Sequence, residues 1–208
     1  YDRHGIFLLD TFNVTVTGNQ IADCQVGIVL CGAQYSTITG NNLTHTDMGI
    51  YLGMVGCNYY TENNLVSENN VVLSGTGIFT DCYGPSNITR NHLRKNSVGV
   101  QANGETETIS YNEIMDCERG IVNVGRTGER FICGNMILNC TFGIDQWGSS
   151  VMIFKNHIAD CEGFGIRSKW CNVSENDISN CGYGVVGGGF VYGNNITGCY
   201  YGIGDGWG

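Results

Sequence analysis

The chain has 208 residues, of which 32 are glycine, 11 are cysteine and 1 is proline, and its formal net charge is −9 at pH 7. This length is enough for one domain with a substantial core. The acidic balance excludes a basic face for nucleic acid, the lack of a Gly-X-Y period excludes collagen, and no apolar run is long enough to predict a membrane span.

An asparagine that returns about every 22 residues organises the sequence. The residue three positions before it is always Val or Ile, and the residue two positions after it is always Val, Ile or Leu. A Gly-Ile or Gly-Val pair follows later in each unit. The nine asparagines are Asn19, Asn41, Asn69, Asn91, Asn112, Asn135, Asn156, Asn176 and Asn194.

Each unit predicts three short strands. In the first unit, one strand is centred on Val16, where flanking threonines give the alternation of a strand with one face in water, one on Ile21, and one begins at Gly27-Ile28. We expect the asparagine at a bend, because its side chain tolerates the left-handed conformation and its amide can bond equivalent asparagines above and below. The glycine of the Gly-Ile pair marks a second sharp turn. A longer step before Asn69 predicts an extra loop near residues 56–61.

A unit of this length cannot bury its own apolar face, so the units must stack. The predicted fold is therefore all-β: a parallel β-helix of about nine coils with three short strands in each coil. No helix, proline or charge run closes either end, so we expect a single β-helix domain over residues 1–208 that is uncapped at both ends.

The three-strand coil and its asparagine ladder resemble the right-handed parallel β-helices of the pectin-lyase-like superfamily. The short Gly-Asn-x-Ile…Cys…Gly-Ile form of the repeat is most similar to the NosD-type repeats of archaeal and bacterial surface and periplasmic proteins. The resemblance extends over residues 10–208 and implies the fold. It does not imply one function, because this scaffold carries lyases, hydrolases, adhesins and structural proteins.

Six cysteines fall five residues after a repeat asparagine, and this cysteine column is predicted to face inward: Cys24, Cys117, Cys140, Cys161, Cys181 and Cys199. Buried thiols and paired disulfides along the column both remain open. The other five cysteines are placed on loops or outward positions, where disulfides or crosslinks could form: Cys31, Cys57, Cys82, Cys133 and Cys171. The sequence holds no C-x-x-C pair, and we expect no metal site and no cofactor.

No catalytic constellation emerges from the sequence. The weak candidates are Asp116 and Asp160, which share one column two coils apart and could form a carboxylate pair, although solvated turn residues are the plainer interpretation. The polygalacturonase pattern of an Asp-Asp pair and a Gly-His-Gly is missing, and Arg167-Ser168-Lys169 matches only that family's Arg-x-Lys. We therefore do not expect an enzyme.

An aromatic column precedes the Gly-Ile pair in the last four coils and consists of Phe142, Phe164, Tyr183 and Tyr201. It could stack on sugar rings, bind another protein chain, or pack within its own turn. Asn-x-Ser/Thr triplets would accept glycans if the chain were exported, and the candidates are Asn13, Asn42, Asn87, Asn172 and Asn195.

These observations favour a structural, extracellular or cell-surface protein, with a periplasmic place as the other option. Its rods would self-associate through coil ends or the aromatic face into a filament, sheath or layer with cysteine crosslinks, as in the cell sheaths of some archaea. The alternative is a carbohydrate-binding or carbohydrate-processing domain of NosD type that uses the outer face, with polysaccharide as its partner. Copper delivery by analogy with NosD is a third option, which lacks the expected clustering of Met, Cys and His.

Overall fold

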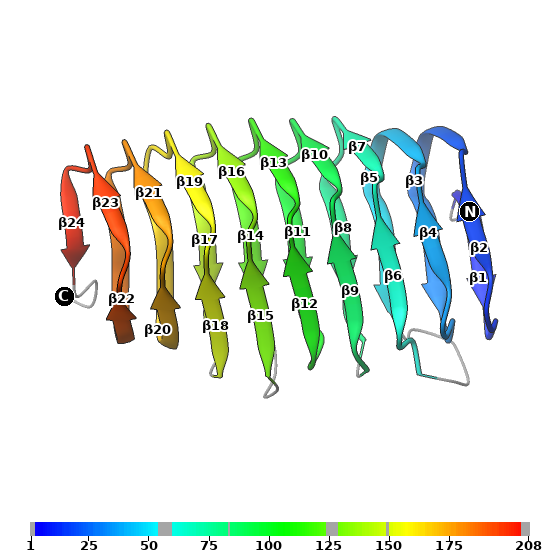
Figure 1. Ribbon diagram of the computed structural model, residues 1–208. Helices are drawn as coiled ribbons and strands as arrows, with labels where there is room; N and C mark the ends of the chain where they lie inside the picture. Colours follow the sequence, from blue (N-terminus) through cyan, green and yellow to red (C-terminus); the bar gives the residue numbers. More distant parts are fainter. Residues whose placement is uncertain (1–2, 54–59, 83, 124–128, 149, 205–208) are drawn as a thin grey trace.

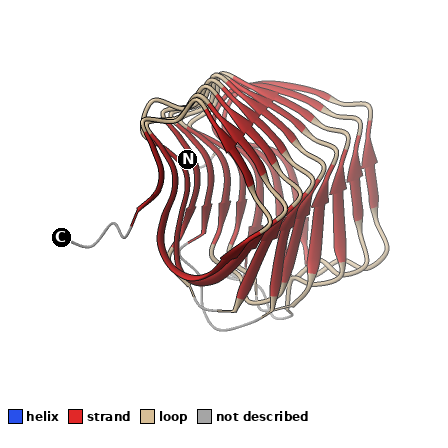
Figure 2. Cartoon of the chain, turned by 60° about the vertical axis from the view of Figure 1, so that its left-hand side comes forward, coloured by secondary structure: helices blue, strands red, loops and turns tan. Residues whose placement is uncertain are grey.

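The computed structural model describes residues 3–53, 60–82, 84–123, 129–148 and 150–204, and these residues form a right-handed parallel β-helix. The turns are stacked along one axis, with the N-terminal turn and the C-terminal turn at opposite ends (Figure 1). Seen closer to that axis, the strands enclose a common interior (Figure 2). The described residues contain no helix, and none of them forms a helical membrane span.

The strands build three faces, and equivalent strands of neighbouring turns pair in parallel. Face 1 consists of β1 (His4–Leu9), β3 (Gln20–Cys31), β5 (Asn42–Gly53), β8 (Thr76–Thr80), β11 (Val98–Ala102), β14 (Arg119–Asn123), β17 (Phe142–Gln146), β20 (Phe164–Ser174), β22 (Tyr183–Tyr192) and β24 (Tyr201–Gly204). Face 2 consists of β2 (Thr15–Thr17), β4 (Thr37–Thr39), β6 (Asn64–Ser67), β9 (Ser86–Thr89), β12 (Glu107–Ser110), β15 (Arg130–Cys133), β18 (Val151–Phe154) and the second halves of β20 and β22. Face 3 consists of the first halves of β3 and β5 with β7 (Asn70–Val72), β10 (His92–Arg94), β13 (Glu113–Met115), β16 (Met136–Leu138), β19 (His157–Ala159), β21 (Asp177–Ser179) and β23 (Asn195–Thr197).

The predicted coil is confirmed, with two differences of detail. The nine repeat asparagines are separated by about eight turns. Three separate strands per turn occur in the middle of the solenoid, whereas β3 and β5 bend without a break from face 3 into face 1, and β20 and β22 bend from face 1 into face 2. Most of the extra loop near residues 56–61 lies outside the described residues.

Aliphatic side chains at equivalent positions pile up inside the solenoid. On face 3, Ile21 pairs with Leu43, and the same column continues through Val71 and Leu93 to Ile114. Leu43, Leu93 and Ile114 are fully buried, and they belong to one continuous apolar cluster that runs from the first turn to the last. The period-2 alternation of each strand therefore places one side chain in this core and its neighbours outside.

The asparagine ladder holds the corner between faces 2 and 3. The Asn112 side chain is buried, and its Nδ2 donates to the Ile88 carbonyl at 2.9 Å and to Asn135 Oδ1 at 3.0 Å. Its own Oδ1 accepts from the backbone N–H and the Nδ2 of Asn91, both at 3.0 Å. The same pattern joins the asparagines from Asn19 to Asn194, always in one direction.

The prediction that the asparagine itself takes the left-handed conformation is wrong. The residue directly before it does so, for example Arg90 with φ of 55° and Lys155 with φ of 55°. A left-handed residue turns the chain between faces 2 and 3, and the asparagine that follows it has no positive φ and bridges neighbouring turns with its side chain.

The glycine of each Gly-Ile pair has a different role from the predicted sharp turn, because its φ is not left-handed. A Cβ on Gly99 would lie 2.6 Å from the carbonyl oxygen of Gly120 in the next turn and 2.6 Å from Ile114 Cγ2. Face 1 thus requires glycine for the close approach of successive turns rather than for backbone freedom.

Candidate functional site

The cysteine column lies at the corner between faces 3 and 1. The structure places Cys117, Cys140, Cys161, Cys181 and Cys199 in five successive turns, each directly beyond a face 3 strand. Each of these sulfur atoms lies within hydrogen-bonding distance of the carbonyl oxygen two residues before it, at 3.3 to 3.7 Å. The five side chains therefore share one orientation and form a regular row of sulfur atoms.

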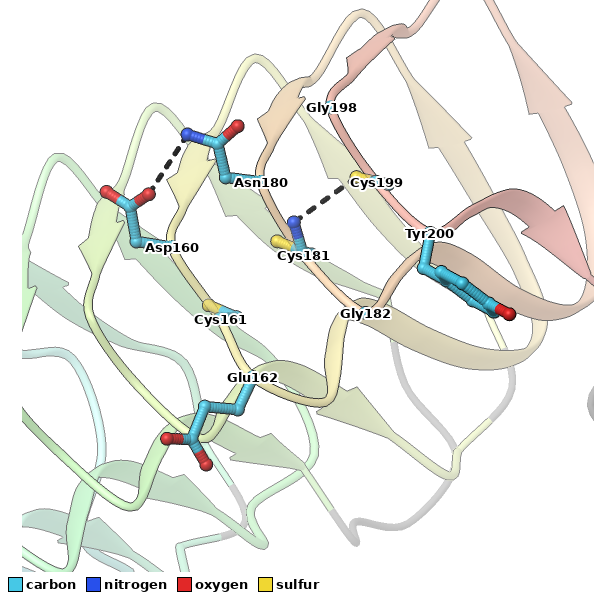
Figure 3. Close-up of a pocket in the computed structure, with 9 residues that line it drawn as sticks. All are labelled: Asp160, Cys161, Glu162, Asn180, Cys181, Gly182, Gly198, Cys199 and Tyr200. Carbon is cyan, nitrogen blue, oxygen red and sulfur yellow. Dashed lines mark hydrogen bonds between the residues drawn. The ribbon is translucent and has the colours of Figure 1, made fainter.

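Four cysteines of the sulfur row are buried and Cys199 is half-buried, and the row lines two open hollows in the surface. A hollow of about 310 Å³ is lined by Cys117 and Cys140 among other residues. A second, of about 670 Å³, is lined by Cys161, Cys181 and Cys199 together with acidic residues of the same turns. Figure 3 shows these three sulfur atoms on successive turns, with the carboxylates of Asp160 and Glu162 on the turns that carry Cys161 and its neighbours.

The thiols act on one another within the row. A hydrogen bond from the Cys161 thiol lowers the pKa of Cys181 to about 7, and the same contact, with burial, raises the pKa of Cys161. A hydrogen bond from Cys140 likewise lowers the pKa of Cys117, while that contact and burial raise the pKa of Cys140. The backbone N–H of Cys181 also donates to Cys199 Sγ at 3.4 Å. Neighbouring turns are thus in direct contact through sulfur.

The same column carries oxygen and nitrogen in the earlier turns. Thr46 Oγ1 and Ser74 Oγ are 2.8 Å apart, and the Ser74 backbone N–H donates to Asn96 Oδ1 at 2.8 Å. Cys24 belongs to the column too, but the equivalent residue in the next turn is Thr46. Soft ligands in adjacent turns begin at Cys117.

The remaining cysteines differ in part from the prediction of loop or outward positions. Cys31 ends β3 and is buried, Cys82 is buried in the turn after β8, and Cys171 lies within the apolar core. Only Cys133 among the described four is partly exposed. Cys57 lies outside the described residues. The six cysteines of the column, and Cys82, Cys133 and Cys171, are free thiols in this structure.

The aromatic column stacks on itself. The Phe142 and Phe164 rings have centroids 4.6 Å apart and planes within 23°, and those of Tyr183 and Tyr201 are 4.8 Å apart with planes within 19°. Rings stacked along the solenoid axis cover one another's faces and turn their edges outward. Sugar rings bind to exposed aromatic faces, so the column itself offers a poor platform for them.

The two candidate carboxylates are residues of a turn. Asp116 and Asp160 have φ of 56° and 57°, and they occupy the left-handed position between faces 3 and 1. Asn139 Nδ2 donates to Asp116 Oδ1 at 2.8 Å, and Asn180 Nδ2 donates to Asp160 Oδ1 at 3.1 Å. Each carboxylate thus accepts from the next turn, and this arrangement favours the turn role over a catalytic pair.

Arg167 and Asp145 pair with each other across neighbouring turns of face 1. Arg167 Nε and Nη2 donate to the two Asp145 oxygens at 2.8 and 2.6 Å, and Asp145 is buried. The guanidinium also lies 4.7 Å from the Trp147 ring centroid and 4.5 Å from that of Phe164.

The glycan-acceptor candidates lie on the outside of the solenoid. Asn13, Asn87, Asn172 and Asn195 are exposed, whereas Asn42 is half-buried. The Asn42 Nδ2 donates to Gln20 Oε1 at 2.8 Å, and its Oδ1 accepts from Asn70 at 2.7 Å.

A buried polar corner between faces 1 and 2 has no counterpart in the sequence-based predictions. Arg130 and Glu107 are almost completely buried, and Arg130 Nη1 donates to Asn123 Oδ1. Arg130 Nε and Nη2 and Glu107 Oε2 find no hydrogen-bond partner among the residues that the structure describes. Burial raises the pKa of the Glu107 carboxyl, and Thr80 and Arg130 act against this shift. The sequence does carry a signal for this corner. Glu107 is charged where the equivalent residue of the preceding turn is Ser86, and Arg130 is charged where the equivalent residue of the following turn is Val151.

The family model for NosD, described as a periplasmic copper-binding protein, matches residues 1–142 of this solenoid. The chain belongs to the NosD family. Its periplasmic description agrees with an extracytoplasmic place for the protein. No curated protein matches the chain.

Because the description of the NosD family names copper, we asked which residues of this chain could bind a metal ion. Among the residues that the structure describes, no group of three or more His, Cys, Asp and Glu side chains is arranged to hold a metal ion. A three- or four-ligand centre therefore does not fit. The cysteine column offers a different donor set, two soft thiols at a time from adjacent turns.

Proposed function

We propose that this NosD-family chain is a structural protein of the cell surface or periplasm, a stiff rod that self-associates end to end. The asparagine ladder supports this proposal. Each asparagine donates to Oδ1 of the next turn in one direction only, from Asn19 towards Asn194. A ladder of this kind has an accepting end and a donating end, so two copies that stack in the same sense continue it, and such heterologous contacts do not close.

Light scattering and electron microscopy over a concentration series, with and without reductant, test the assembly. We expect polymers in both conditions, with reductant removing only crosslinks. Ile196→Lys should reduce assembly, because it places a charge at the half-buried inner position of β23. Thr197→Lys is the matched control, because Thr197 is exposed on the same strand. A chain that stays monomeric at the highest concentrations would contradict the proposal.

Carbohydrate binding is a second candidate function. An open groove at Trp170 is a better binding place for a sugar than the aromatic column. The groove has a volume of about 220 Å³ and is lined by Glu129, Ser150, Val151, Met152, Trp170 and Asn172. The Trp170 indole is 69% exposed, with the Lys169 ammonium 4.5 Å from its ring centroid. An indole face beside a carboxylate, a hydroxyl and an amide suits the apolar and polar sides of a sugar ring.

Titration with neutral and uronate oligosaccharides, followed by tryptophan fluorescence, tests this candidate. We expect saturable quenching that Trp170→Ala abolishes. Trp147→Ala is the control, because Trp147 lies against Arg167 and does not line the groove. Quenching that is absent, or that persists in Trp170→Ala, would contradict it.

Copper binding, which the description of the NosD family names, is a third candidate for this chain. The observation that favours it is the cysteine column, because thiolates are soft ligands and select Cu(I). Competition for Cu(I) against a chromophoric chelator, in the absence of oxygen, measures such binding directly. A wild-type chain that leaves the chelator saturated would refute this candidate.

A further inference from the structure

An apolar trough lies on the outside of face 1, in the N-terminal turns. It has a volume of about 450 Å³, which is within the usual range of small-molecule sites. Its floor consists of Val26, Val29 and Cys31, which are buried but form a cluster of their own, separate from the main core. Val29 lies between two core residues of β3, so the alternation of the strand points its side chain outwards. The solenoid therefore carries an apolar hollow on its exterior.

The register between turns explains why the trough forms at this place. Val29 pairs with Phe7 of β1 in the preceding turn and with Tyr51 of β5 in the following turn. Both partners have long aromatic side chains, and both line the trough. Val26 is likewise shorter than His4, its partner in β1. One turn of short side chains between two turns of longer ones leaves a trough that follows β3.

In the outer column of these turns, one turn lacks a ring. The column runs through Phe7, Val29, Tyr51 and Phe79. The Tyr51 and Phe79 rings stack with centroids 5.4 Å apart and planes within 23°, and rings in adjacent turns of the aromatic column stack at 4.6 and 4.8 Å. The Tyr51 face turned away from Phe79 borders the trough at the level of Val29. A flat ring placed there continues the stack at the spacing that this molecule uses elsewhere.

The polar side chains at the trough suit a hydroxyl group. His4 and Gln25 line it and are exposed. An imidazole and an amide can each donate and accept a hydrogen bond, as a hydroxyl group does. The described residues of the lining include no Asp, Glu, Lys or Arg, so they offer no carboxylate, ammonium or guanidinium partner to a charged ligand. A neutral ligand therefore fits best.

We propose that this trough binds a small, neutral, planar aromatic molecule with a hydroxyl group. The ring stacks on Tyr51 above Val29, and the hydroxyl group bonds to His4 or Gln25. Burial of the ring against the aliphatic floor supplies affinity, and stacking on Tyr51 favours a flat ring over a puckered one. The trough and the Trp170 groove share no lining residue, so each can bind its ligand without the other.

A matched pair of probes tests the preference for a flat ring. 2-Naphthol is planar and uncharged at neutral pH, and 2-decalol has the same carbon skeleton and hydroxyl group but puckered rings. We expect calorimetry to show saturable binding of 2-naphthol, and binding of 2-decalol that is about five- to tenfold weaker. Equal binding of the two probes, or no binding of 2-naphthol, would overturn the proposal.

Val29→Phe supplies the missing ring from the chain itself. The new side chain occupies the place of the ligand, so saturable binding of 2-naphthol should be lost. The control is Val122→Phe, because Val122 belongs to the same outer column but does not line the trough. Tyr51→Leu keeps an apolar side chain without the ring and should weaken binding about five- to tenfold, whereas Tyr51→Phe should not. Unchanged binding by Val29→Phe or by Tyr51→Leu would place the ligand elsewhere and contradict the proposal.

A measurement on the wild-type chain covers a Val29→Phe variant that does not fold, as judged by circular dichroism. In methyl NMR spectra, 2-naphthol should shift the signals of Val26 and Val29. It should leave those of Val122 and Val186 in place, because these two valines belong to later turns of the same outer column. Signals of Val26 and Val29 that do not move at saturation, or equal shifts at all four valines, would overturn the proposal.

Discussion

The asparagine ladder shows how one residue type can connect every turn of a solenoid. Each buried asparagine satisfies a carbonyl of the preceding turn and two N–H groups, and no other side chain of its size offers one acceptor and two donors in this geometry. The left-handed residue before it makes this possible by turning the chain first.

Replacing a central asparagine should therefore be costly. Asn112→Ala removes the donor to the Ile88 carbonyl and the acceptor of the Asn91 backbone N–H in a buried site, while Asn91 Nδ2 keeps the carbonyls of Val66 and Thr89. We expect a loss of about 2–4 kcal/mol in the free energy of unfolding. Asn19→Ala is the control, because Asn19 is half-buried and accepts from no asparagine below it, and it should cost less than about 1 kcal/mol. Urea unfolding measures both, and equal losses would show that the ladder adds nothing beyond local capping.

The repeat asparagines, the aliphatic columns and the three-strand coil could be predicted from the sequence, because a period repeated nine times averages out local exceptions. The left-handed residue could not, since Glu68, Arg90, Tyr111 and Lys155 share no side-chain property. The stacking of aromatic rings on one another was also not predictable, because spacing in sequence fixes the column but not the ring planes.

At the scale of single strands, the polar corner shows that inward positions are not uniformly apolar. Glu107 on β12 and Arg130 on β15 occupy neighbouring turns of face 2, at inward positions. Such a pair lets two charges stay buried, although replacing both with apolar residues of similar volume is often neutral or stabilising.

The folded-state pKa of Glu107 is raised, so the folded chain holds this proton to higher pH than the unfolded chain does. The contribution of Glu107 to stability is therefore largest below its unfolded pKa and falls as pH rises through the folded value. Arg130→Met should deepen this fall, because it removes the positive charge that opposes the shift. We expect a loss of about 3–5 kcal/mol near pH 7.5, and a smaller loss near pH 5, where the carboxyl can be neutral.

Urea unfolding at the two pH values measures this difference. Arg94→Met is the control, because Arg94 is exposed and its contact with Asp116 is 3.7 Å long, so it should change little at either pH. A loss in Arg130→Met that is the same at both pH values would show that Glu107 does not respond to the missing charge.

The whole molecule is quasi-one-dimensional, since each turn contacts only its neighbours. Its cooperativity therefore depends on the weakest interface between turns. The glycines of face 1 set how closely the turns approach, and the row of thiols begins only in the second half of the rod. The unfolding of the N-terminal half and that of the C-terminal half are therefore coupled only through the central turns, which include β11 and β14.

Gly99→Ala should uncouple the halves. The new Cβ would lie 2.6 Å from the Gly120 carbonyl oxygen of β14. A backbone carbonyl cannot move aside without disturbing the hydrogen bonds between the strands of face 1. We therefore expect a cost of at least about 3 kcal/mol at that interface.

Two probes measure the effect. The three tryptophans lie at positions 147, 170 and 207, so fluorescence reports on the C-terminal half alone, while hydrogen exchange in β3 and β5 reports on the N-terminal half. In the wild-type chain the two probes should give one transition in urea, and in Gly99→Ala they should separate. Gly202→Ala is the control, because a Cβ there has open space around it. If both variants show a single shared transition, coupling between the halves does not depend on the close approach of the face 1 glycines.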